Sequence, residues 1–321
     1  MKKRLITLTV MLMAGALVAG CGAKTPGETP ETGILQETPS EEGTVEKIKV
    51  ATSINPIDEI VKIIGGDRIE TWKIVPEGSE AHDFEPTIKD MGRLTEVDLL
   101  FVNGLEMEPW SEKAAENSGN KDLKIVDLSE GLDLIHLDET DPDHDHENEE
   151  GHDHGEFDPH IWLSVDSLVT MAEHAKDELT LLIPEDESYF LENYNTFREE
   201  ALALKNDYVE KFKPYEGKAF VTGHAAFGYM TRELGLVQKS VEGPFQEGEP
   251  TPKTLEDLIG FVKAEGIRTI FLEEAASPKV SETLARETGS ETVAINTLES
   301  TGELLPTLKE TYEKVLESFS N

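Results

Sequence analysis

The chain contains a single cysteine, Cys21, among its 321 residues. One thiol cannot form a disulfide within the chain, so stability has to come from packed apolar side chains. Hydrophobic residues make up 37% of the sequence, which is enough for real cores, and the length is enough for two domains. A disulfide-stapled miniature fold is therefore excluded, and a globular protein is expected.

Basic residues are also scarce: 29 Lys and Arg face 66 Asp and Glu, and the net charge is −37. Polyanions are repelled by such a surface, so nucleic acid and anionic membrane surfaces are excluded as partners. An acidic field favours cations, but salt limits its reach to about 8 Å. A solvated acidic exported protein would carry the same charge, so the net charge does not decide the function.

Long apolar runs are missing after residue 20. Residues 1–20 join a basic start, MKKR, to the apolar stretch LITLTVMLMAGALVAG, which is typical of a signal peptide. The sequence VAGC that ends at Cys21 resembles the bacterial lipobox, which predicts a lipid on Cys21; an ordinary signal peptide with an incidental cysteine is the alternative. The lipid would hold an exported protein at the outer face of the cell membrane, or in the periplasm, without a spanning helix.

Apolar residues are nearly missing from residues 21–46 as well, where Pro, Gly, Thr and Glu prevail, so we expect a flexible tether there. Short apolar runs then alternate with helical patterns over 47–186 and again over 214–321. Such alternation predicts parallel sheets covered by helices. The expected fold class is α/β, with an N-terminal lobe at 47–186 and a C-terminal lobe at 214–321.

Glycine and proline are both missing from residues 187–213. Apolar side chains recur there at steps of three and four, which predicts one amphipathic helix of roughly 40 Å. The helix is either a rigid connector between the lobes or an ordinary packed helix inside one domain. Its predicted buried face consists of Phe190, Tyr194, Phe197, Ala201, Leu204, Tyr208 and Phe212.

Three histidines, by contrast, fall at points where strands are expected to end. His82 follows the run IETWKIV, His160 stands in DPHIW, and His224 follows KAFVTG, where we expect it to open the next helix. Ligands of parallel sheets bind at the carboxyl ends of strands. Three imidazoles and one carboxylate would suit Zn²⁺ and leave no open position for an attacking water.

The residues alone leave this site open. No H-x-x-x-H or H-E-x-x-H pair is present, and a lone histidine is more often a hydrogen-bonded core residue. Several carboxylates follow strand ends or stand near His82, and any of them could complete the site: Glu80, Glu273, Glu274 and Glu299.

Five segments together resemble the zinc-binding solute-binding lipoproteins of bacterial ABC importers, in order and in spacing. The likeness covers about residues 47–321. The segments are EGSEAHDFEPTIKDM (77–91), FDPHIWLSV (157–165), FVTGHAAFGYMTRELGL (220–236), GEPTPKTLEDLIGFVK (248–263) and TLES (297–300).

The resemblance implies a metal site in the cleft between the lobes, with helix 187–213 as the connector. Carried onto this sequence, the ligands are His82 and His160 from the first lobe and His224 and Glu299 from the second. Glu80 is a backup ligand, since the position directly before His82 is an alanine.

The implied function is capture of Zn²⁺ outside the cytoplasm and its delivery, as transported cargo, to the permease of an ABC importer. Manganese-binding relatives have a carboxylate where this chain has His224, so three imidazoles favour zinc. A manganese importer component, or a surface adhesin or zinc buffer, are the alternatives. No metallohydrolase signature is present, so we expect that the protein is not an enzyme. We also expect it to be a monomer.

The segment 141–156 holds a second group of histidines among many carboxylates: His144, His146, His152 and His154. Nothing fixes the geometry of such pairs, so we interpret them as weak auxiliary zinc ligands, with a merely solvated acidic loop as the alternative. Asp158 is expected to orient His160 through the free ring N–H of that histidine.

Overall fold

The computed structural model describes residues 47–137, 155–246, 250–273 and 278–320. These residues belong to one compact unit and contain two four-stranded sheets in which every strand pairing is parallel. The predicted signal peptide, Cys21, the predicted tether and the four loop histidines lie outside the described residues. The predicted α/β class with two parallel-sheet lobes is confirmed.

The N-terminal lobe holds the first sheet, in the strand order β2-β1-β3-β4. Its central strand β3 reads LLFV and is buried throughout, as expected for a parallel strand with both faces covered. Its elements are β1 (Ile48–Thr52), α1 (Asn55–Gly65), β2 (Ile69–Lys73), α2 (Ile88–Arg93), β3 (Leu99–Val102), α3 (Ser111–Ser118) and β4 (Lys124–Asp127), and α4 (Val165–Leu182) follows.

The C-terminal lobe repeats this topology in the order β6-β5-β7-β8. Strand order reverses between β1 and β3 in one lobe and between β5 and β7 in the other, which are the points where such sheets bind ligands. The elements of this lobe are β5 (Ala219–His224), α6 (Gly228–Leu234), β6 (Val237–Glu242), α7 (Pro252–Glu265), β7 (Thr269–Glu273), α8 (Lys279–Thr288), β8 (Glu291–Ile295) and α9 (Leu304–Ser318).

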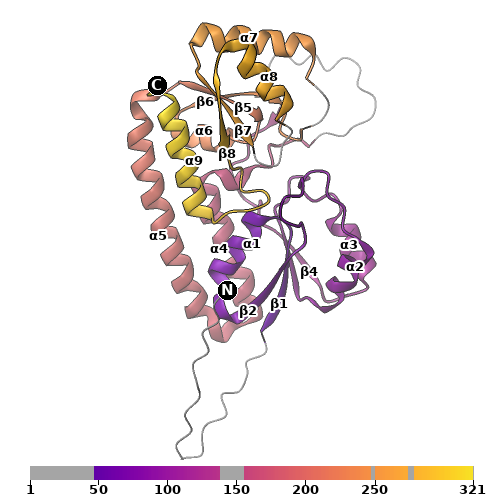
Figure 1. The fold of residues 1–321 in the computed structure, drawn as a ribbon. Coiled ribbons are helices and arrows are strands. Elements are labelled where there is room, and N and C mark those ends of the chain that lie inside the picture. Colours follow the sequence, from indigo (N-terminus) through magenta and orange to yellow (C-terminus); the bar gives the residue numbers. More distant parts are fainter. Residues whose placement is uncertain (1–46, 138–154, 247–249, 274–277, 321) are drawn as a thin grey trace, which may run out of the picture. The chain divides into compact units, whose positions relative to one another are not determined.

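Helix α5 (Glu187–Phe212) connects the lobes. It packs against α1 and α4 and also against α6 and α9 of the C-terminal lobe, and Figure 1 shows it alongside α9. Six of its seven predicted face residues are buried, and only Leu204 is half-buried. The expectation of a connecting helix is thereby confirmed, while the domain boundaries remain a prediction.

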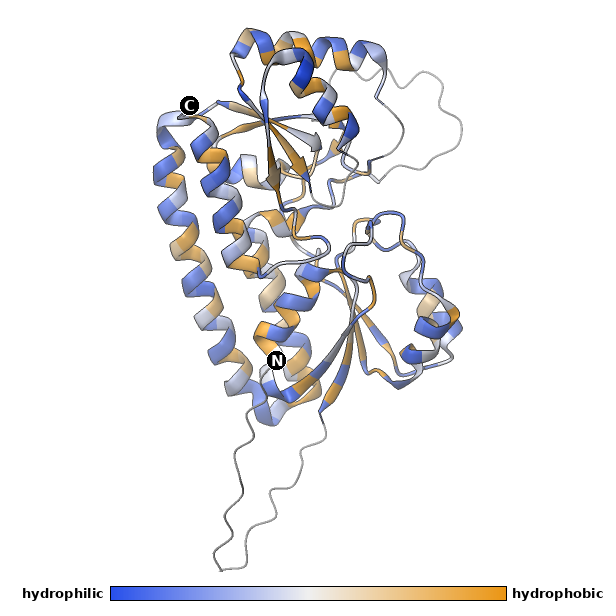
Figure 2. Ribbon diagram, in the orientation of Figure 1, coloured by the Kyte–Doolittle hydropathy of each residue, from blue (hydrophilic) through white to orange (hydrophobic). Residues whose placement is uncertain are grey.

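One apolar core runs through both lobes. It includes Phe101 of β3, Phe197 of α5 and Phe220 of β5, and Figure 2 shows the apolar residues of the sheets and of the inner helix faces. A second, smaller core lies under α7 and α8, where Val221 points away from Phe220 because successive strand residues face opposite sides. Since α1, α4, α5 and α9 share the first core, the lobes are joined by packing as well as by chain.

Within the described ranges, no helix combines the length and the apolar character that a membrane crossing requires.

Removal of the Phe197 ring tests the packing of the connector. Phe197 is 3% exposed and belongs to the shared core. We expect Phe197→Ala to lower the free energy of unfolding by about 3–5 kcal/mol, because it opens a cavity. Urea denaturation measures this, with Glu199→Ala on the exposed side of the same helix as the control. A loss no larger than that of the control would contradict the shared core.

Candidate metal centre

Four side chains from four separate segments converge at the carboxyl ends of the strands. His82 lies in the loop after β2, and His160 directly precedes a 3₁₀ turn (Ile161–Leu163) before α4. Glu299 lies between β8 and α9, and His224 is the last residue of β5. The expectation that His224 opens a helix is wrong: α6 begins at Gly228. The strand backbone, not a helix, holds this imidazole.

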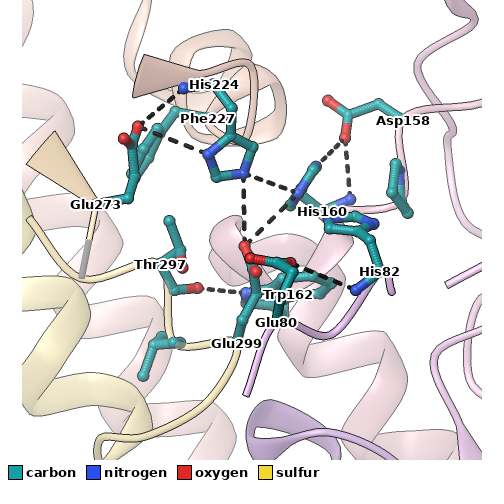
Figure 3. A network of polar contacts seen from close by, with 12 residues as sticks. Glu80, His82, Asp158, His160, Trp162, His224, Phe227, Glu273, Thr297 and Glu299 are labelled. Atoms are coloured by element: carbon teal, nitrogen blue, oxygen red, sulfur yellow. Dashed lines mark hydrogen bonds and ion pairs between the residues drawn. The ribbon is translucent and has the colours of Figure 1, made fainter. Parts of the chain in front are cut away.

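The ligand atoms of His82, His160, His224 and Glu299 all lie within 4.8 Å of one another. His160 Nε2 is 3.3 Å from His224 Nε2 and 3.7 Å from Glu299 Oε1, and His224 Nε2 is 3.5 Å from the same oxygen. Figure 3 shows the four side chains pointing toward one another. A tetrahedral zinc site with bonds of about 2.0–2.1 Å has neighbouring ligand atoms about 3.4 Å apart. The separations in this group therefore suit a small four-coordinate cation.

Burial of these polar side chains is energetically unfavourable unless the group binds a ligand. His160, His224 and Glu299 are at most 1% exposed, and His82 is half-buried. Among the described residues, neither carboxylate oxygen of Glu299 has a hydrogen-bond partner, and neither ring nitrogen of His82 has one. Buried polar atoms without partners cost about 1–3 kcal/mol each, more when charged. A bound cation would satisfy one ring nitrogen of His82 and at least one carboxylate oxygen of Glu299.

Asp158 fixes the orientation of His160, as expected. Its Oδ1 accepts the backbone N–H of His160 at 2.9 Å and lies 2.8 Å from the ring Nδ1. An Nδ1–H that donates to Asp158 leaves the lone pair of Nε2 facing the other ligands. The indole of Trp162 is fully buried with its ring 5.2 Å from that of His160, so it keeps water from this side.

Glu273, one of the carboxylates considered as a metal ligand, instead binds the backbone of β5. Its carboxylate accepts the backbone N–H of Gly223 at 2.9 and 3.0 Å and that of His224 at 3.3 Å, and it lies 3.7 Å from His224 Nδ1. It therefore stands behind His224 and is not among the four converging residues. A Cβ on Gly223 would lie 2.2 Å from Glu273 Oε2, so only glycine permits this approach.

The charges of neighbouring side chains shift the pKa values of three of these residues. Burial alone would raise the pKa of Glu299, but His224, His160 and His82 outweigh it and lower that pKa to about 2. Burial would likewise lower the pKa of His224, but Glu299 and then Glu273 raise it to about 9. Burial together with His160 lowers the pKa of His82 to about 3. The group thus holds an imidazolium beside a carboxylate, with neutral imidazole next to them.

Glu80 lies at the margin of the group. Its Oε1 accepts the backbone N–H of His82 at 3.4 Å, and burial followed by the charge of Glu299 raises its pKa. Figure 3 shows it next to Glu299, but it is not one of the four residues whose ligand atoms converge. Its role as a backup ligand stays a prediction, and Glu274 lies outside the described residues.

Comparison with known families identifies the fold and the kind of protein. A family model described as "Zinc-uptake complex component A periplasmic" matches residues 50–321. The chain belongs to this ZnuA family. The sequence resemblance to zinc-binding solute-binding proteins is thereby confirmed.

Relatives of this ZnuA family member include named zinc-binding proteins. The zinc-binding protein AdcA of Streptococcus pyogenes is 36% identical over 262 residues, which are 79% of this chain and 51% of that protein. The chain thus spans about half the length of the curated relatives it matches first.

Two solved structures share the ZnuA-family fold over nearly their whole length. The AdcAII protein of Streptococcus pneumoniae has a TM-score of 0.76 at 30% identity, covering 86% of this chain and 100% of that chain. The laminin-binding protein Lmb of Streptococcus agalactiae, described as bifunctional with adhesin and metal transporting activity, has a TM-score of 0.75 at 26% identity, covering 84% and 99%.

Residues that the sequence did not single out support the site from behind. The Asn103 side chain donates to the carbonyl of Pro159 at 2.9 Å, directly before His160. The buried Glu108 in turn accepts the backbone N–H groups of Asn103 at 3.0 Å and Gly104 at 3.1 Å. Burial raises the pKa of Glu108 to about 7 despite these donors. No sequence motif marks this pair, since only the fold brings residues 103 and 159 together.

The raised pKa of Glu108 predicts a pH dependence of stability. From about pH 4.5 to about pH 7 the folded protein holds a proton at Glu108 that the unfolded chain has lost, so the free energy of unfolding falls as pH rises, by as much as about 3 kcal/mol. We expect Glu108→Gln to reduce this fall. Urea denaturation of the metal-free protein on both sides of the window measures it.

The matched control for this experiment is Glu112→Gln, which changes an exposed carboxyl of α3. It should keep the slope of the unaltered protein. An equal slope in the Glu108→Gln protein would show that Glu108 titrates at its ordinary pKa.

Proposed function

We propose that this protein captures Zn²⁺ outside the cytoplasm and delivers it to the membrane permease of an ABC importer. One observation carries the proposal: three buried or half-buried imidazoles converge on a buried carboxylate that has no hydrogen-bond partner among the described residues. The family description and the zinc-binding relative support zinc as the cargo. His82, His160, His224 and Glu299 are the proposed ligands.

The same ligand set argues for binding without catalysis. Four protein ligands fill a tetrahedral coordination shell, so no position is left for a reactive water. Zinc must displace the proton that the nearby carboxylate of Glu299 keeps on His224, because ligation needs a neutral imidazole. Imidazole-rich coordination also favours zinc over manganese, which prefers carboxylate and water oxygens. We therefore propose a transport protein that is not an enzyme and that acts as a monomer.

The proposed location rests on residues before the described part of the chain. A lipid on Cys21 and a tether to residue 46 would keep the protein at the outer face of the cell membrane. The likeness to Lmb favours a second candidate, in which the same anchored protein also serves as an adhesin. Loss of growth in zinc-limited medium on gene deletion would support import, and unchanged growth would favour the adhesin alone.

Removal of a ligand tests the site. We expect His224→Ala and Glu299→Ala each to weaken zinc binding more than about 100-fold, since the remaining three ligands leave the shell incomplete. Competition titration against a chromophoric chelator measures the affinity. His174→Ala on helix α4, away from the four residues, is the control and should bind about one Zn²⁺ with unchanged affinity. Near-normal affinity of either ligand variant would refute the assignment.

Deletion of residues 143–154 tests the auxiliary role of the loop histidines. The segments on either side are held together: Leu137 N–H donates to Glu156 O at 3.1 Å, and Asp158 N–H donates to Ile135 O at 2.9 Å. His136 and Phe157 also form an antiparallel bridge. We expect the high-affinity site to survive the deletion while weaker zinc binding in equilibrium dialysis is lost. Loss of the high-affinity site would show that at least one loop histidine belongs to that site.

A further inference from the structure

The loop that carries Glu299 belongs to the C-terminal lobe by sequence, yet it is bonded to the N-terminal lobe. We define this ligand loop as residues 297–302, between β8 and α9. The Asn55 amide, at the start of α1, donates to Leu298 O at 3.1 Å and to Gly302 O at 2.9 Å. The backbone N–H of Asn55 donates to Glu299 O at 3.1 Å. Three bonds from one residue thus hold the loop on both sides of the ligand.

Two further donors from the first 186 residues complete this attachment. Lys73, the last residue of β2, donates to Ser300 O at 3.0 Å and to Asn55 Oδ1 at 3.2 Å, which orients the Asn55 amide. The Trp162 indole donates to Thr297 O at 2.7 Å. Asn55, Lys73 and Trp162 together therefore contact the backbone of nearly every residue of the ligand loop.

The conformation of the loop shows that it is held in one shape. Leu298, directly before Glu299, is fully buried and has a φ of 68°, a left-handed conformation that costs about 1 kcal/mol or more for a residue with a side chain. Such a conformation persists where the surroundings over-determine it. The bond from Asn55 to Leu298 O is one of those constraints, and Asn55 is itself 5% exposed.

We propose that Asn55 and Lys73 are positioning residues that fasten the Glu299 loop to the N-terminal lobe, so that three ligands form one half-site and His224 alone forms the other. The proposal rests on the proposed zinc function. Asn55 and Lys73 then hold the Glu299 loop against the lobe that carries His82 and His160. His224 is fixed to β5 and held from behind by Glu273. A relative movement of the lobes would separate His224 from the other three ligands.

The proposal is tested by zinc competition titration of the full chain. We expect Asn55→Ala to weaken zinc binding about tenfold, since the loop that carries Glu299 loses two side-chain hydrogen bonds, one buried and one partly buried. Asn120→Ala is the matched control: its amide also donates to two backbone carbonyls, Leu94 O at 3.1 Å and Val97 O at 2.9 Å, away from the ligands. Equal affinities of the two variants would overturn the proposal.

A double-mutant cycle separates positioning from general damage. In a Glu299→Ala background, Asn55→Ala should weaken zinc binding by no more than about twofold, because the group it positions is gone. In a His224→Ala background the full effect of about tenfold should remain, since the two residues belong to different half-sites. A full further loss in the Glu299→Ala background would mean that Asn55 does not act through Glu299.

If Asn55→Ala does not fold, Lys73→Met provides a second test. Lys73 is half-buried, and this substitution removes only its ammonium donor. It should weaken zinc binding through Glu299 in the same cycle, and an unchanged affinity would overturn the proposal. Failure of the proposed function looks different: Glu299→Ala and His224→Ala would then bind zinc normally. If both ligand variants lose zinc while Asn55→Ala matches its control, only the positioning role is wrong.

Discussion

The structure depends on one buried electrostatic arrangement, the carboxylate of Glu299 enclosed by three imidazoles. A lone buried carboxylate is strongly unfavourable, and here the surrounding imidazoles compensate it, above all through the proton on His224. Every supporting contact serves to keep these groups facing one another: Asp158 turns His160, and Glu273 holds the backbone of His224. The fold therefore holds a site whose buried charge and polar atoms are compensated best when a divalent cation replaces the proton.

The shared core decides how such a site can open. Helices from both lobes bury side chains in the same apolar cluster, and α5 runs along it without a break. Large hinge rotation would expose much of that cluster to water, at roughly 25 cal/mol for each Å² of apolar surface. Small displacements at the carboxyl ends of the strands are far cheaper. A ligand set divided three to one needs only such a displacement, because withdrawal of a single imidazole empties the shell.

The sequence predicted much of this, for reasons that are local. Apolar periodicity marked α5, and the histidines at strand ends pointed to the edge where ligands bind. It did not mark β6, whose residues VQKSVE form a partly exposed edge strand with little apolar signal. It placed His224 at a helix start because a strand and a helix meet there. Asn55 and Asn103 gave no signal at all, since their partners lie 243 and 56 residues away in the chain.

The hydrogen-bonded pairing of residues 135–137 with residues 156–158 fixes the backbone directly before His160 without help from the residues between. The entropy of closing a chain segment whose two ends are already paired depends only weakly on the length of that segment. That entropy changes by only about 0.6 kcal/mol for each doubling of length. A change in the number of residues between the two paired strands of chain should therefore cost little stability, while Asp158 and His160, just beyond the pairing, keep their places.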